Sequence, residues 1–209
     1  MSGSPDRPAW IDHVPYGDAA GRLRTLYDRV TGPDKNVDNI MLSHSLRPHT
    51  MEGHMAIYKA VLHHHGNTIP KWFLETIGVY VSLLNGCGYC VEHHFAGLRR
   101  LLADEGRADS IRAALAADRP STAPLDAAQI AALDYARALT RDPAGMAEPM
   151  IATLRTAGWS DGEILEINQV AAYFNYANRT VLGLGVSTVG DDLGLSPNNS
   201  EDPNDWSHR

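Results

Sequence analysis

Two cysteines and two histidines within eight residues are the side chains of this sequence most able to do chemistry. The segment NGCGYCVEHH contains Cys87, Cys90, His93 and His94, and the chain has no other cysteine. Residues three and four apart share one face of a helix, so Cys87, Cys90 and His94 would form a single column, with His93 beside it. Cysteines at this spacing can form a redox-active disulfide, bind a metal ion or pack as buried thiols, and the spacing leaves all three interpretations open.

A helix that starts at this segment would activate either thiol. The N-terminus of a helix carries partial positive charge and free N–H groups, which lower the pKa of a cysteine and act most strongly on Cys87. Cys90 lies deeper, but His94 follows one turn later and could accept its proton. Helix electrostatics alone therefore favour Cys87 as the nucleophile.

Glu75 is a carboxylate in an otherwise apolar stretch, PKWFLETIGVYVSLLNG, which precedes the cysteines. The stretch predicts a buried helix that ends at Asn85 and Gly86. In an antiparallel hairpin, a residue about ten positions before the turn lies beside one about seven positions after it. We therefore expect Glu75 to lie near His94 as a proton relay, with pairing inside the core as the structural alternative.

Composition limits the class of protein. The chain has 209 residues, of which 44% are hydrophobic and 21% charged, and its formal net charge is −7. The basic residues are scattered, so we expect no nucleic-acid partner. No signal peptide and no apolar run long enough for a membrane helix is found, so we expect a cytoplasmic protein without a membrane partner.

Hydrophobic residues recur at helical spacing along most of the chain, and alternating strand patterns are nearly absent, so the predicted fold class is all-α. We expect helices over approximately 18–30, 49–65, 71–84, 87–104, 108–117, 126–140, 146–157 and 160–182. Glu75, Cys87 and Cys90 lie 88 residues before Glu163, Asn175 and Asn178, which suggests a duplicated helical hairpin. For Asn175, Asn178 and Arg179 we expect structural hydrogen bonding, and for His54 no ligand role.

Three regions are expected along the chain: an N-terminal extension with a short helix over 1–39, a helical domain over 40–187, and a polar tail over 188–209 to which no chemistry is assigned.

One pattern resembles a known family. Glu75, Cys87, Tyr89, Cys90 and His94 satisfy E-x11-C-x-Y-C-x3-H, and EILEINQVAAYFNYANRTVLGLGV follows downstream. Together these resemble the alkylhydroperoxidase D / carboxymuconolactone decarboxylase superfamily, in particular its peroxidase-related branch, over roughly residues 40–187.

The resemblance implies a homo-oligomeric helical bundle, a dimer, trimer or hexamer, that reduces hydroperoxides without a cofactor or metal. Buried helices rich in Val, Leu and Ile around the motif suggest an apolar channel suited to organic hydroperoxides. The resemblance also implies that Cys90 attacks the peroxide and becomes a sulfenic acid, that Cys87 closes the disulfide, and that an external dithiol donor reduces it. His94 and Glu75 would relay the proton. The best-known alkylhydroperoxidase D proteins have a histidine where this chain has Tyr89, which is a poor base, so slow peroxidase turnover or a related disulfide reductase activity is an alternative.

Two further alternatives come from other classes of protein. Cys87, Cys90 and His94 supply three zinc ligands, and His93 or a histidine at 63–65 could supply a fourth, although no second cysteine pair exists. A non-catalytic helical protein with two packed cysteines is the other, but it leaves Glu75 and His94 without a role.

Overall fold

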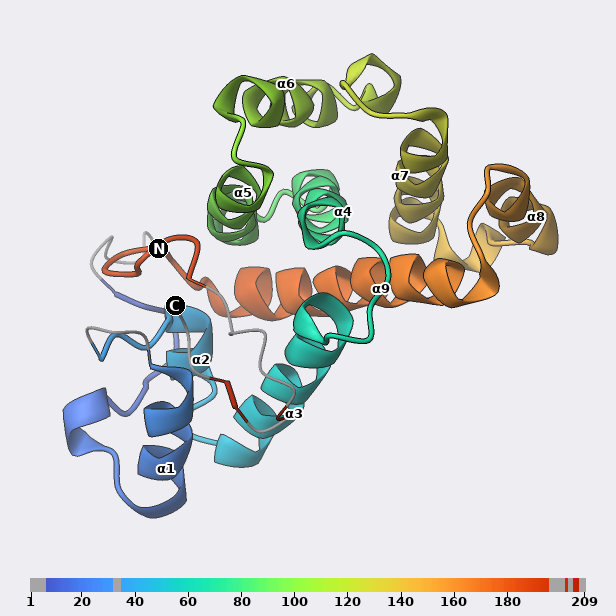
Figure 1. Cartoon of the computed structure of the whole chain (residues 1–209). Helices are drawn as coiled ribbons and strands as arrows, with labels where there is room; N and C mark the ends of the chain where they lie inside the picture. Colours follow the sequence, from blue (N-terminus) through green and yellow to red (C-terminus); the bar gives the residue numbers. More distant parts are fainter. Residues whose placement is uncertain (1–6, 32–34, 196–201, 203–204, 207–209) are drawn as a thin grey trace.

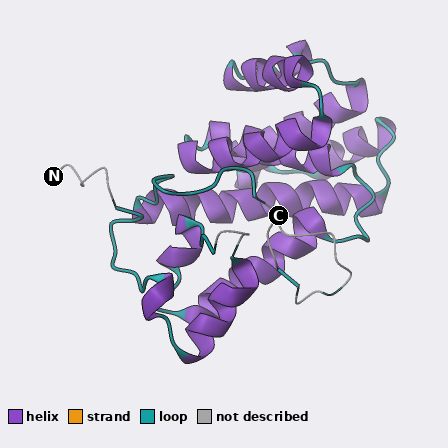
Figure 2. Cartoon of the chain, turned by 60° about the vertical axis from the view of Figure 1, so that its left-hand side comes forward, coloured by secondary structure: helices purple, strands orange, loops and turns teal. Residues whose placement is uncertain are grey.

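The structure is a computed structural model that describes residues 7–31, 35–195, 202 and 205–206. Within these residues the chain forms helices and no strand, which confirms the all-α prediction (Figure 2). The α-helices have these bounds: α1 Gly21–Val30, α2 Asn39–Ser43, α3 Pro48–Tyr58, α4 Lys71–Leu84, α5 Gly88–Leu102, α6 Glu105–Ala116, α7 Ala127–Arg141, α8 Glu148–Thr156 and α9 Asp161–Leu184.

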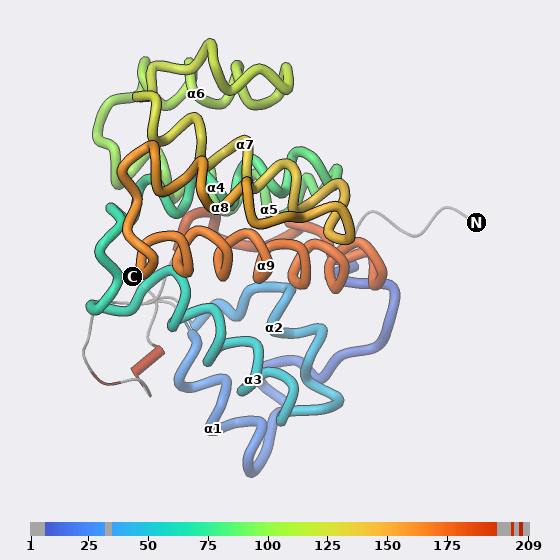
Figure 3. Tube along the Cα trace, turned by 90° about the vertical axis from the view of Figure 1, so that its right-hand side faces the viewer, coloured from blue at the N-terminus to red at the C-terminus, as the bar shows by residue number. Residues whose placement is uncertain are grey.

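The helix α9 lies at the centre of the molecule. In Figure 1 it runs between α4, α5 and α7 on one side and α1, α2 and α3 on the other, and the side view in Figure 3 shows the same order. Helices α4, α5 and α7 all contact α9, and α4 packs most extensively on α5. The dithiol segment at the start of α5 therefore lies where the α4–α5 hairpin packs on the central helix α9.

Helix α4 is the most buried element. Every residue from 73 to 82 is buried, as expected for a helix that is apolar on nearly all sides. Gly78 lets α9 approach closely, because a Cβ atom at this position would lie 2.2 Å from the ring of Phe174. The absence of a side chain at Gly78 thus sets the spacing of the two helices beside the candidate site.

Local sequence signals define most helix boundaries. Asp126 caps α7 and Ser160 caps α9, each through a capping box with the residue three positions later. Helix α9 ends at Gly185, whose φ of 60° lies in the left-handed region that favours glycine. These signals explain why the expected helices agree with the observed ones to within a few residues.

The helix predicted after Pro48 changes form before it ends. Residues Lys59–His63 form a π-helix that continues α3. Lys59 in this turn is 3% exposed, and its ammonium group donates hydrogen bonds to the backbone carbonyls of Asp202 and Asp205. A buried cation needs such partners, and here residues far along the chain supply them.

The duplicated hairpin is not observed. Helix α9 runs unbroken from Asp161 to Leu184, so Asn175 and Asn178 lie within one helix, whereas the corresponding cysteines follow a turn. The first copy turns at Asn85 and Gly86, where Gly86 has a φ of +69°. The second copy has Tyr173 and Phe174 at these positions, and both continue the helix. That part of the prediction was wrong.

The described part of the polar tail packs against the helical domain. Asn39 donates its side-chain amide to the carbonyls of Ser187 and Val189. Gly194 contacts α5 so closely that a Cβ atom there would lie 2.8 Å from the Cβ of Ala96. Residues 187–195 therefore form one wall of the site region.

No helix of the described residues is both long enough and apolar enough to cross a membrane.

Candidate active site

The hairpin of α4 and α5 brings Glu75 and His94 together. A Glu75 carboxylate oxygen lies 2.7 Å from His94 Nδ1, and the two side chains are 3% and 14% exposed. Gly97, one turn after His94, lies against the carboxylate, since a Cβ atom there would make van der Waals contact with it at 3.5 Å. The hydrogen bond leaves His94 Nε2 as the ring nitrogen available for proton exchange.

The two cysteines occupy the start of α5, as expected. Cys87 is the residue that precedes the helix, and Cys90 lies in its first turn. Both are free thiols, 0% and 3% exposed. The side chains are adjacent and hydrogen-bonded to each other.

The surroundings distinguish the two thiols. The hydrogen bond from Cys90 lowers the pKa of Cys87, the backbone N–H of Cys90 and the side chain of Asn178 add to the effect, and burial opposes it. The same hydrogen bond, burial and the charge of Cys87 raise the pKa of Cys90 well above its ordinary value. Of the two thiols, Cys87 therefore gives up its proton more readily, in agreement with the helix argument.

A polar network on α4 and α9 supports the dithiol. Asn178 is fully buried and donates to the Ser82 hydroxyl at 3.0 Å, while its carbonyl accepts from Asn85 at 2.9 Å. Asn85 also donates to Asn175, as expected for structural bonding across the hairpin. The contact of Asn178 with both sulfur atoms is a further role, which its position within an apolar helix only hinted at.

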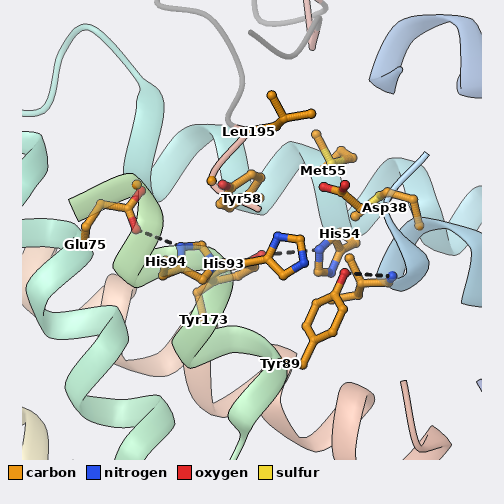
Figure 4. A pocket seen from close by; sticks show the side chains of 14 residues that line it. Asp38, His54, Met55, Tyr58, Glu75, Tyr89, His93, His94, Tyr173 and Leu195 are labelled. Atoms are coloured by element: carbon orange, nitrogen blue, oxygen red, sulfur yellow. Dashed lines mark hydrogen bonds and ion pairs between the residues drawn. The ribbon is translucent and has the colours of Figure 1, made fainter. Parts of the chain in front are cut away.

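A cavity of about 50 Å³ lies next to the Glu75–His94 pair (Figure 4). That volume holds a few water-sized molecules. More than half of its described lining residues carry a polar group: Asp38, His54, Tyr58, Glu75, Tyr89, His93, His94 and Tyr173. Hydrophobic periodicity reports helix packing, and it does not show which few polar side chains face a cavity.

Neither cysteine is among the described residues that line this cavity. Cys90 lies close behind its wall, because a charge on Cys90 raises the pKa of Tyr58 and of Tyr173, both of which line it. Burial is the main cause of both shifts and keeps the two phenols protonated. Tyr173 makes a 3.2 Å hydrogen bond with His54, so His54 faces the cavity with its ring already engaged.

His93 and Tyr89 have a partner that the sequence analysis did not identify. Asp191, from the polar tail, accepts a hydrogen bond from the Tyr89 hydroxyl at 2.8 Å and lies 3.2 Å from His93 Nε2. No local pattern links residues about a hundred positions apart. Tyr89, where the best-known relatives have histidine, thus positions a carboxylate beside the cavity.

No group of three or more His, Cys, Asp or Glu side chains suited to a metal ion is found in the described part of the chain. The described residues therefore contain no ligand set that would support the zinc alternative.

Comparison with protein families supports the resemblance found in the sequence. Residues 48–138 match the model of the carboxymuconolactone decarboxylase family. This segment, somewhat less than half of the chain, is similar to that family. It contains Glu75, both cysteines and His94, and it confirms the resemblance inferred from the sequence. No curated protein sequence matches the chain.

Several solved structures share the fold. A crystal structure described as an alkylhydroperoxidase AhpD core, an uncharacterised peroxidase-related protein from Ralstonia eutropha JMP134, is 24% identical, with a TM-score of 0.75 over 87% of this chain and 92% of that one. An uncharacterised peroxidase-related protein from Silicibacter sp. TM1040 is 26% identical, with a TM-score of 0.74 over 90% and 95%. The debrominase Bmp8, solved with 2,3,4-tribromopyrrole, is 18% identical, with a TM-score of 0.63 over 79% and 82%. The fold thus also occurs in a protein with a different activity.

Proposed function

We propose that the protein is a thiol peroxidase of the alkylhydroperoxidase D type. The observation that carries this proposal is the buried Glu75–His94 pair, 2.7 Å apart, one turn after a free dithiol at a helix start. A carboxylate that holds an imidazole beside a thiol is suited to accept the thiol proton. The similarity to peroxidase-related proteins supports the same chemistry.

In the proposed reaction the sulfur of Cys90 attacks the outer oxygen of a hydroperoxide and becomes a sulfenic acid, while the peroxide is reduced to an alcohol. The thiol proton passes to His94, which Glu75 stabilises. The sulfur of Cys87 then attacks the Cys90 sulfur, water leaves, and a disulfide forms; an external dithiol reduces it. Cys90 receives this role because it lies behind the cavity wall, although Cys87 has the lower pKa.

The test is an intact mass and free-thiol count before and after one equivalent of cumene hydroperoxide, on metal-analysed protein. We expect rapid loss of both thiols and a mass decrease of about 2 Da. Two unreactive thiols would refute the proposal.

Single substitutions assign the roles of the two sulfur atoms. Cys90→Ser should abolish peroxide consumption, whereas Cys87→Ser should leave a sulfenic acid on Cys90 that dimedone traps. A sulfenic acid trapped on Cys87 in the Cys90→Ser variant would reverse the assignment.

We further propose an organic hydroperoxide as substrate, because apolar helices surround the site, and a homo-oligomeric assembly, as the resemblance implies. Large apolar side chains on one face of α9 support assembly, since Leu165 and Tyr176 are 60% and 42% exposed. If thiol oxidation by hydrogen peroxide were as fast as oxidation by cumene hydroperoxide, this would count against an organic hydroperoxide as the substrate. A monomer by light scattering at micromolar concentration would count against assembly.

A further inference from the structure

Two consecutive histidines of α5 line the same cavity, and each is held by a carboxylate from a different element. Glu75 of α4 holds His94 at Nδ1, and Asp191 of the tail holds His93 at Nε2. The side chains of His93 and Asp191 are 9% and 1% exposed. The site proposed above uses only the first of these pairs.

Asp191 is fixed by contacts on several sides. The backbone N–H of Asn39 donates to both of its oxygens, at 3.0 and 3.2 Å, and the Tyr89 hydroxyl donates at 2.8 Å. Its hydrogen bond with His93 therefore requires a proton on His93 Nε2 and leaves Nδ1 as the nitrogen free to exchange a proton. Asp191 thus orients this ring as Glu75 orients the other.

A third carboxyl group, that of Asp38, lines the cavity beside His93. Figure 4 shows Glu75 at one end of the labelled row and Asp38 at the other, with His94 and His93 between them. Burial raises the pKa of Asp38 to about 7, the charges of Asp191 and Asp192 contribute, and the charge of His93 opposes them. At pH 7 about half of the Asp38 carboxyl groups therefore hold a proton, which can be donated into the cavity.

We propose that Asp38 and His93 form a second proton-transfer site, which protonates the oxygen that leaves when a hydroperoxide is reduced in this cavity. The inference rests on the proposed thiol peroxidase. Asp191 and Tyr89 act as positioning residues that hold His93 in place.

The atoms balance in one step. The Cys90 sulfur forms a bond to the outer oxygen, the O–O bond breaks, and the inner oxygen leaves with the electron pair and takes the proton of the Asp38 carboxyl group by way of His93 Nδ1. The thiol proton has meanwhile passed to His94. His94 therefore gains one proton at one end of the cavity, and the Asp38 end loses one. Proton exchange through solvent restores both ends before the next turnover.

The dependence on the leaving group separates this role from a structural one. An alkyl hydroperoxide expels a strongly basic alkoxide, which needs a proton, whereas peracetic acid expels acetate, which leaves without one. We expect Asp38→Asn and His93→Gln to slow thiol oxidation by tert-butyl hydroperoxide about 100-fold and oxidation by peracetic acid less than about 3-fold. The matched control is Asp109→Asn on the exposed face of α6, which should leave both rates unchanged.

Each result supports or overturns a defined claim. The second proton-transfer site would be overturned if thiol oxidation in both folded variants were slowed by the same factor with the two oxidants, or ran at the wild-type rate with both. Either result would leave the proposed peroxidase intact. Failure of the wild-type thiols to react with either oxidant would instead overturn the proposed function. His93→Gln serves as the second variant if Asp38→Asn does not fold, with circular dichroism as the measure of folding.

Discussion

Replacement of Glu75 by glutamine tests the proton relay with little change in shape. Glutamine has the size of glutamate, and its amide can still hydrogen-bond to His94, but it carries no charge. Exposure of only 3% and 14% for the two side chains means that solvent screens their interaction weakly. The substitution therefore removes the charge that stabilises a protonated His94 and leaves the packing in place.

The expected magnitude follows from this contact. A hydrogen bond to a charged group contributes about 1.5–3 kcal/mol, and each 1.4 kcal/mol corresponds to about tenfold in rate. The Glu75–His94 hydrogen bond is 2.7 Å long and buried, so we assign it this range of about 1.5–3 kcal/mol. Glu75→Gln should therefore slow thiol oxidation by a hydroperoxide about 10- to 100-fold.

The assay is single-turnover thiol loss by stopped flow, with prereduced protein and excess cumene hydroperoxide. Glu92→Gln is the matched control, because Glu92 lies on α5, the helix of His94, but pairs with Arg112 and is 44% exposed. We expect the control to stay within about twofold of the wild type. A wild-type rate for Glu75→Gln, in protein with unchanged thermal unfolding, would show that the pair only stabilises the core.

Three further predictions concern the surroundings of the site. Asn178→Leu removes a donor to the thiolate and should raise the pKa of Cys87, measured as the pH dependence of iodoacetamide alkylation; an unchanged profile would contradict this role. Gly78→Ala forces a Cβ atom to within 2.2 Å of the Phe174 ring and should cost about 1–3 kcal/mol in denaturant unfolding, and a neutral or stabilising result would refute it. Burial lowers the pKa of His54 from 6.5 to about 3, so the unfolded chain binds a proton that the folded one does not, and stability falls as pH falls below 6.5. His54→Gln should abolish this component, about 2 kcal/mol between about pH 7 and pH 5, and an equal acid dependence of both proteins would show that His54 titrates normally when folded.

The sequence by itself determined the local part of this protein. Helical periodicity and the breaks at prolines and glycines define the helices, because these signals act between residues a few positions apart. The pairing of Glu75 with His94 also followed, since one short turn fixes which residues of two antiparallel helices meet. Likewise, the thiols lie at a helix start because Asn85 and Gly86 end the preceding helix.

Only the tertiary structure decided what surrounds that motif. Asp191 reaches His93 across 98 positions and Asn39 across 152, and Asn178 reaches Ser82 across 96. Such contacts depend on how the tail and α9 pack on the first hairpin, and no spacing rule in one sequence specifies that packing. The same limit explains the mistaken second hairpin: a matched spacing of 88 residues resembled a repeat, but α9 has Tyr173 and Phe174 at the positions where Asn85 and Gly86 form the turn. The chemical groups were visible in the sequence, but their partners across the cavity were set by packing.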